Sequence, residues 1–248
     1  MKDLREWLGA LRAIGELVEV DAEVDPHLEI TEISDRVMKA GGPALLFRNV
    51  KGSDMPVLIN QFGSERRMAM GLGGADLDEI AGRIAEIAQM QPPQGLMDKV
   101  KALGTLKDLA SLGTKTVRSG PCQEIVLRGD EVDLDRIPIL TCWPGDGGPF
   151  VTLPLVFSND PRTGTRNCGM YRVQKVDKRT CMMHWQVHKD GRQHLLDSDG
   201  HVPVAVVIGT DPAVTYSATA PLPPALDEMM FAGFLRGQKV EMVKAVSQ

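Results

Sequence analysis

After about residue 120 the chain becomes a series of short apolar segments separated by turn-forming residues. The segments are CQEIVLRG, VDLDRIPIL, FVTLPLVFSND, CGMYRVQKVD, TCMMHWQVH and VPVAVVIG. Short strands at this spacing are typical of an antiparallel sheet or a barrel. The chain has 25 glycines, 16 prolines and only 4% aromatic residues, so turns are frequent and the core depends on aliphatic side chains and methionine. A helix over residues 226–235 and a strand from Val240 complete this half.

Residues 1–90 have a different pattern, in which helical and strand periods alternate. Apolar residues at helical spacing predict helices over 4–14, from Asp25-Pro26 to about residue 40, and from Asp76 to the Pro92-Pro93 pair. Apolar runs predict strands at 17–20, 43–50 and 55–62. This part is therefore a small α/β unit, and the sequence predicts an α+β protein with domains 1–117 and 118–248.

The overall composition excludes several classes of protein. The formal net charge of −5 argues against a nucleic-acid binder. No apolar run reaches the ~18–20 residues of a membrane helix, and the N-terminus lacks the apolar core of a signal peptide. We therefore expect a cytoplasmic chain without a membrane span. The four cysteines form no C-x-x-C pair, which favours buried structural thiols over a disulfide framework or a zinc site.

Chemically active residues gather in the middle of the second half. The dense segments are TCWPGDGGPFVT, RNCGMYRVQ and CMMHWQVHKDGR. In a strand, His184, Gln186 and His188 would share a face, because side chains alternate along a strand. Met170 and Arg172 would share a face of the preceding strand, so a hairpin would bring an arginine, an amide and two imidazoles together. The alternative is an exposed polar sheet face with a solvated arginine.

Asn167 and Glu228 supply oxygen atoms suited to a hard metal ion. Together with one imidazole, they fit Mn²⁺ or Mg²⁺ better than structural zinc. Each residue also has a purely structural interpretation. Asn is common in turns, and a Glu in the first turn of a helix is stabilised by the helix dipole.

In combination, these segments resemble the UbiD family of prenylated-flavin decarboxylases. The similarity covers nearly the whole chain and depends on the number and order of the matching segments. In the first half the segments are DLREWLGALRAIGELVEV, DPHLEITEISDRV, GPALLFRNVKG, PVLINQFGS and ERRMAMGLG. In the second half they are PCQEIVLRGDEVDLDRIPIL, TCWPGDGGPFVT, NCGMYRVQ and FAGFLRGQKVEMVKA.

The resemblance implies a split β-barrel flavin-binding domain after the small α/β domain, with prenylated FMN as cofactor. Asn167, His188 and Glu228 match the family's metal ligands, which hold Mn²⁺ (or Mg²⁺) against the cofactor phosphate. The implied cofactor-binding residues are Thr152, Met170, Tyr171, Arg172, His184, Trp185, Gln186, Lys189, Asp190, Ala218, Thr219 and Ala220. Thr152 and the stretch 217–220 also match positions near an associated monovalent cation such as K⁺. Many members have Arg in place of His184, so this chain departs from the family at that contact.

The implied reaction is the reversible, non-oxidative (de)carboxylation of an aromatic or α,β-unsaturated carboxylic acid. Arg172 matches the arginine of the family's catalytic Glu-Arg-Glu set, which helps to hold the substrate carboxylate. A planar guanidinium fork is well shaped for that contact. The cofactor acts as an electron sink while CO₂ leaves, and an acid then protonates the carbon.

Family members continue well past the position matched by residue 248, and the acidic residues of the catalytic set lie in that later segment. We therefore expect the proton donor and the family's C-terminal domain to be absent from this chain. Complete family enzymes are homo-oligomers, dimers or hexamers, and a flavin prenyltransferase supplies their cofactor. Two other hypotheses are a non-catalytic flavin- and metal-binding module and a subunit of a multi-subunit carboxylase.

Overall fold

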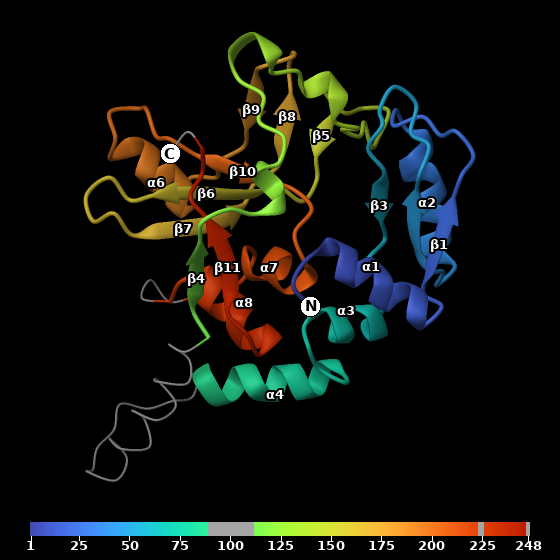
Figure 1. Cartoon of the computed structure of the whole chain (residues 1–248), viewed down its shortest axis with the longest axis horizontal. Helices are drawn as coiled ribbons and strands as arrows, with labels where there is room; N and C mark the ends of the chain where they lie inside the picture. The colour runs from blue at the N-terminus through green and yellow to red at the C-terminus, as the bar shows by residue number, and fades with distance from the viewer. Residues whose placement is uncertain (89–111, 223–225, 247–248) are drawn as a thin grey trace.

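The computed structural model describes residues 1–88, 112–222 and 226–246, which have a mixed α+β fold (Figure 1). The first part contains α1 (Leu4–Ala13), β1 (Leu17–Val20), α2 (Glu29–Lys39), β2 (Ala44–Phe47), β3 (Val57–Ile59), α3 (Glu65–Gly71) and α4 (Leu77–Ala88). The second part contains β4 (Thr114–Val117), β5 (Phe150–Val151), β6 (Leu155–Asn159), β7 (Arg166–Met170), β8 (Val173–Lys175), β9 (Cys181–Met183), α6 (Asp190–Leu196), β10 (Ala205–Val207), α7 (Pro212–Ser217), α8 (Glu228–Arg236) and β11 (Val240–Val243). Three 3₁₀ turns lie at Pro121–Gln123, Gly129–Glu131 and Leu134–Arg136.

The first part is built around a three-stranded sheet of order β1-β2-β3. β1 and β2 are parallel, and β3 joins β2 in the antiparallel sense. The parallel pair is connected through α2, as parallel strands require a crossover. The Asp3 carboxylate accepts from the Glu6 N–H at 2.9 Å, which caps α1 as predicted. Trp7 and Leu11 on this helix are fully buried and pack with Ala44 of β2.

The second part has two three-stranded antiparallel sheets, of order β10-β6-β7 and β5-β8-β9. β11 pairs in parallel with β4, which brings the last described strand beside the first strand of this part. The two three-stranded sheets confirm the predicted antiparallel pairing, whereas the β4–β11 pair is parallel. Among the strands from 112 onward that the structure describes, the three sheets stay separate and none closes on itself.

Several predicted elements are wrong in detail. α2 begins at Glu29 rather than at Asp25, because the Asp25 carboxylate accepts from the His27 N–H and Leu28 has φ +69°. The segments 122–129 and 132–140 form 3₁₀ turns and irregular chain instead of strands. The short helices α3, α6 and α7 were not predicted. The thiol prediction holds for the buried Cys168, whereas Cys122 and Cys181 are exposed.

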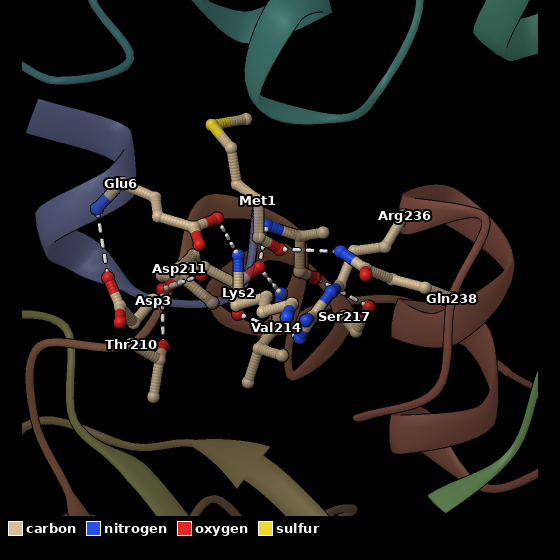
Figure 2. A network of polar contacts seen from close by, with 12 residues as sticks. Met1, Lys2, Asp3, Glu6, Thr210, Asp211, Val214, Ser217, Arg236 and Gln238 are labelled. Carbon is tan, nitrogen blue, oxygen red and sulfur yellow. Dashed lines mark hydrogen bonds and ion pairs between the residues drawn. The ribbon is translucent and has the colours of Figure 1, made fainter. Parts of the chain in front are cut away.

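A buried ion pair joins α7 to α8 (Figure 2). The Arg236 Nη1 lies 3.2 Å from the Asp211 Oδ2, and the side chains are only 6% and 4% exposed. The other carboxylate oxygen of Asp211 caps α7 by accepting from the N–H groups of Ala213 and Val214. The Gln238 Nε2 donates to the Met1 carbonyl oxygen at 3.2 Å, so the N-terminal residues lie beside this pair of helices.

The first part of the chain supports these two helices from below (Figure 1). Ala69, Leu72 and Ile80 from the α3–α4 region share one core cluster with Ala213 and Leu235. The helix pair is therefore anchored at the end that carries the ion pair. Its opposite end, at the start of α8, faces β7.

No helix within the described ranges has the length and apolar character needed to cross a bilayer.

Candidate functional site

The site begins where the chain leaves one sheet and enters another. β7 ends at Met170, β8 begins at Val173, and Tyr171 and Arg172 form the break between them. The Tyr171 side chain turns back over Gly169, where an added Cβ would lie 2.3 Å from the phenol oxygen. Arg172 is exposed, and its guanidinium carbon lies 5.2 Å from the centre of the Phe150 ring.

A cavity of about 400 Å³ opens at this break. It is lined by Met170, Tyr171, Arg172, His184, Gln186 and Lys189. All six belong to the residues implied to bind the cofactor, so the fold brings half of that set around one cavity. The His184 N–H donates to the Arg172 carbonyl at 3.2 Å, which holds the two sides of the cavity together.

The predicted strand through His188 is wrong, although the hairpin itself is present. β9 ends at Met183, and residues 184–186 continue as irregular chain into a turn that contains His188. The cause is Trp185, whose ring packs on Gly191 and meets Tyr171 edge-on with centroids 6.1 Å apart. This packing pulls the chain away from β8 and places an exposed His188 just before α6.

Glu228 reaches the free edge of β7 at Cys168, the residue directly after Asn167. β7 is the edge strand of its sheet, so the Cys168 N–H has no partner strand on its outer side among the described strands. This N–H donates to the Glu228 Oε2 at 3.0 Å. Asn167 is buried, and its Nδ2 has no hydrogen-bond partner among the described residues. Burial raises the pKa of the Glu228 carboxyl, and the charges of Asp227 and Asp190 add to the rise.

Tyr171 completes the surroundings of this pair. Burial raises the pKa of its phenol, while the neighbouring Asn167 side chain and the Gly191 backbone oppose the rise. The phenol therefore stays neutral near pH 7, and its ring forms part of the cavity wall.

The three predicted metal ligands suit a divalent ion by their chemistry, although no hydrogen bond among the described residues joins the exposed His188 to Asn167 or Glu228. An amide, a carboxylate and an imidazole suit Mn²⁺ or Mg²⁺. The buried Asn167 Nδ2 has no hydrogen-bond partner in the part of the chain that the structure describes, and a buried polar group normally has one. A flip of the amide would place its oxygen at this position, where a metal ion could bind it. The adjoining cavity is of the size that small-molecule and cofactor sites have.

The other implied residues lie around the same region. Ala218 directly follows α7, and its carbonyl accepts from the Met170 N–H at 3.1 Å. Thr219 is exposed, and its hydroxyl donates to the Tyr216 carbonyl. Thr152 is exposed directly after β5, Lys189 and Asp190 begin α6, and Ala220 follows Thr219 in the loop after α7.

Two polar pairs beside the site were missed by sequence reasoning. Ser158 Oγ and His194 Nδ1 lie 2.9 Å apart in the buried contact between β6 and α6. Arg166 bonds to Asp227, the residue directly before Glu228. The sequence carried a signal only for Asp227 itself, because an Asp directly before a helix is a common N-cap; no local pattern indicated either pairing.

Both parts of the chain match family models. Residues 8–88 match the 3-octaprenyl-4-hydroxybenzoate carboxy-lyase N-terminal domain, and residues 115–248 match the Rift-related domain of the same carboxy-lyase. The chain belongs to the UbiD family. An uncharacterized protein of Archaeoglobus fulgidus is 46% identical over 247 residues, which are 98% of this UbiD-family chain and 50% of that protein.

Solved UbiD-class structures share its fold. An evolved dimeric form of HmfF from Pelotomaculum thermopropionicum, in complex with prFMN, superposes with a TM-score of 0.84 and 26% identity, over 100% of this chain and 54% of that one. Vanillic acid decarboxylase of Sedimentibacter hydroxybenzoicus in closed form gives 0.81 and 27%, over 99% and 51%. This UbiD-family chain therefore spans about half the length of the relatives that it matches.

Proposed function

We propose that the chain supplies the flavin- and metal-holding part of a UbiD-type decarboxylase. The reaction is the reversible, non-oxidative (de)carboxylation of an aromatic or α,β-unsaturated carboxylic acid. The observation that carries the proposal is the cavity at the β7–β8 break, which six of the implied cofactor residues line. The prFMN bound in the related HmfF structure supports the same cofactor here.

The metal ligands in this proposal are Asn167, His188 and Glu228, with Mn²⁺ (or Mg²⁺) as the ion. In support, Glu228 accepts from the N–H of Cys168, the residue directly after Asn167. His188 lies in an exposed turn that can adjust to a ligand. We further propose that Thr152 and residues 218–220 hold the cofactor phosphate and a K⁺ ion.

Arg172 binds the substrate carboxylate in this proposal. Its guanidinium is always charged and lies at the cavity wall, and the Phe150 ring limits its movement by a cation–π contact. Lys189 adds a second positive charge to the same wall, which favours anions. When bound, prenylated FMN supplies an electron sink for the electron pair that remains as CO₂ leaves.

We also propose that the chain divides near residue 117 and that the sheets after it form a split barrel around the cofactor. The separate family matches, over 8–88 and 115–248, support two domains, and the pairing of β4 with β11 favours a boundary just before β4. A flavin prenyltransferase supplies the cofactor, and the complete enzyme is a homo-oligomer; the dimeric HmfF relative supports this assembly.

The proposal is tested by expressing the chain together with a flavin prenyltransferase and Mn²⁺. We expect the purified chain to retain flavin, as seen in its visible spectrum. Asn167→Ala, His188→Ala and Glu228→Ala each lose most of that flavin, because the phosphate charge is no longer neutralised. His201→Ala, which removes an exposed histidine from a loop, keeps it. Folded wild-type chain without flavin would overturn the proposal.

CO₂ release distinguishes an enzyme from a binding module. Flavin-loaded chain that releases CO₂ from an aromatic or unsaturated acid acts as a decarboxylase, and Arg172→Ala then loses turnover while it keeps metal and flavin. Bound flavin without CO₂ release from any tested acid favours the non-catalytic module.

A further inference from the structure

We propose that Arg166 and Asp227 are positioning residues that hold Glu228 beside Asn167. The inference rests on the proposed metal site, whose carboxylate and amide ligands each follow one member of this ion pair in the sequence. Nothing in the ion pair itself touches the cavity. Its role is to fix the start of α8 on β7.

Both carboxylate oxygens of Asp227 are used, each for a different task. Oδ1 caps α8 by accepting from the N–H groups of Met229 and Met230 at 2.7 and 3.3 Å. Oδ2 accepts from Nε and Nη2 of Arg166 at 3.0 and 2.5 Å. One side chain therefore joins the first turn of α8 to the first residue of β7.

The faces of β7 explain why this contact governs the metal ligands. Side chains alternate along a strand, so Arg166 and Cys168 share the face toward α8 and Asn167 lies on the opposite face. Cys168 packs in one core cluster with Met229 and Ala232 of α8. The Glu228 carboxylate binds the Cys168 N–H at the strand edge, where it can meet a ligand from the Asn167 face. A small shift of α8 along β7 would break that arrangement.

The ion pair is only partly buried, so its removal can change the position of Glu228 without unfolding the chain. Each side chain is 30% exposed, so solvent screens this pair more than the Asp211–Arg236 pair, and its contribution to stability is smaller. Apart from Asp227, Arg166 bonds only the Met242 sulfur of β11 among the described residues, a weak acceptor 3.4 Å from its Nη1. Loss of the pair is therefore expected to affect ligand geometry more than the thermal midpoint.

Two substitutions isolate the ion pair. Asp227→Asn removes the negative charge but keeps a side chain that caps helices equally well. Arg166→Met removes the guanidinium and keeps an unbranched stem against α8. Arg166→Lys restores the charge with a single donor group. The matched control is Arg162→Met. Arg162 lies in the turn after β6, and its guanidinium pairs with Asp197.

The readout is Mn²⁺ affinity of the full chain with FMN, measured from the EPR signal of free Mn²⁺, with a thermal melt of each variant. We expect Asp227→Asn and Arg166→Met each to weaken Mn²⁺ binding at least about tenfold, as loss of groups that orient metal ligands does. The double variant is no weaker than the worse single variant, since both remove one contact. Arg166→Lys recovers part of the affinity, and Arg162→Met binds like wild type.

The direction in which Arg166→Met changes the Mn²⁺ affinity distinguishes a positioning role from an effect of the arginine's charge alone. Removal of a positive charge near a cation site strengthens cation binding through Coulomb's law, whereas loss of positioning weakens it. Folded Arg166→Met that binds Mn²⁺ as tightly as wild type, or more tightly, overturns the inference. Wild-type chain that binds no Mn²⁺ overturns the proposed metal site instead.

Discussion

Gly169 decides how the cavity wall is built, because the phenol ring of Tyr171 occupies the space that a side chain would take. An added Cβ would lie 2.3 Å from the phenol oxygen and 2.4 Å from the adjacent ring carbon, distances that require the ring to move. The same ring lies edge-on to Trp185, and the Asn167 side chain beside it opposes the rise that burial causes in the pKa of the Tyr171 phenol. One glycine therefore connects strand β7 to both the cavity and the metal-ligand candidates.

Gly169→Ala is expected to lower the free energy of unfolding by about 1–3 kcal/mol, the cost of overpacking a filled site. It is also expected to weaken FMN binding, because Tyr171 lines the cavity. Gly9→Ala is the matched control: nothing lies within 4 Å of an added Cβ in the middle of α1, so this change stabilises by about 0.5–1 kcal/mol. Urea unfolding measures the stability of both variants, and titration with FMN measures binding. A Gly169→Ala chain as stable as wild type would show that the ring has free space.

At the scale of elements, α7 and α8 act as one unit between the first part of the chain and the site. Their far end carries the Asp211–Arg236 pair, and their near end presents Glu228 and Ala218 to β7. Gly71 allows this packing, because an added Cβ would lie 2.9 Å from Pro212 at the start of α7. The sequence predicted α8 through its Gly237 stop, which is confirmed by φ +67° at that residue. It could not predict α7, whose six residues are too few for a helical period to show.

Arg236→Met is expected to destabilise the fold by about 3–5 kcal/mol, because it leaves the buried Asp211 charge without its partner. The double variant with Asp211→Asn recovers part of this loss, since no uncompensated charge remains. Chemical unfolding of the two single variants and the double variant gives the coupling. Strictly additive losses would contradict a direct interaction between the two side chains.

At the scale of the whole molecule, charged contacts fasten the irregular loop 128–137 to the hairpin β8–β9. Lys178 bonds to Asp133 at 3.0 Å and Arg179 to Asp130 at 2.8 Å, while the Leu134 N–H donates to the Lys178 carbonyl. The Lys178 contact lowers the pKa of the Asp133 carboxyl, and the Asp135 N–H lowers it further. The opposite end of this hairpin forms part of the cavity wall.

The contribution of Asp133 depends on pH in a defined direction. Because its folded-state pKa is depressed, its stabilisation is present above the unfolded pKa of about 3.9 and is lost as pH falls through the folded value. We therefore expect Lys178→Met to lower the Tm slightly at pH 7 and to match wild type in strong acid or in 1 M salt, which screens exposed pairs. A Tm difference that persists unchanged in acid would contradict this assignment.

The sequence predicted the class of the fold because periodicity and caps are local. α1, α4 and α8 carry their caps in adjacent residues, as Asp76 does by accepting from the Glu79 N–H. Errors arose where distant contacts decided the outcome. Trp185 leaves the strand path to pack on Gly191, and the loop 128–137 joins the hairpin through charged contacts instead of pairing as a strand. Residues 91–120 are predicted to be helical or irregular, which is wrong where β4 forms at 114–117; positions 91–111 lie outside the described residues.

The site was predictable in composition but not in arrangement. Six implied cofactor residues line one cavity, yet their approach depends on the break between two sheets at Tyr171 and Arg172. No local pattern indicates that break. The Arg166–Asp227 pair joins residues 61 positions apart, and only the packing of α8 on β7 brings them together.

ENDOR spectroscopy of the chain with Mn²⁺ and FMN tests the proposal that the chain holds a metal ion between its own ligands and a flavin phosphate. We expect a ³¹P coupling from the phosphate and a ¹⁴N coupling from one imidazole, and we expect His188→Ala to remove the ¹⁴N coupling. Chain that binds both Mn²⁺ and FMN but gives no ³¹P coupling would contradict the account.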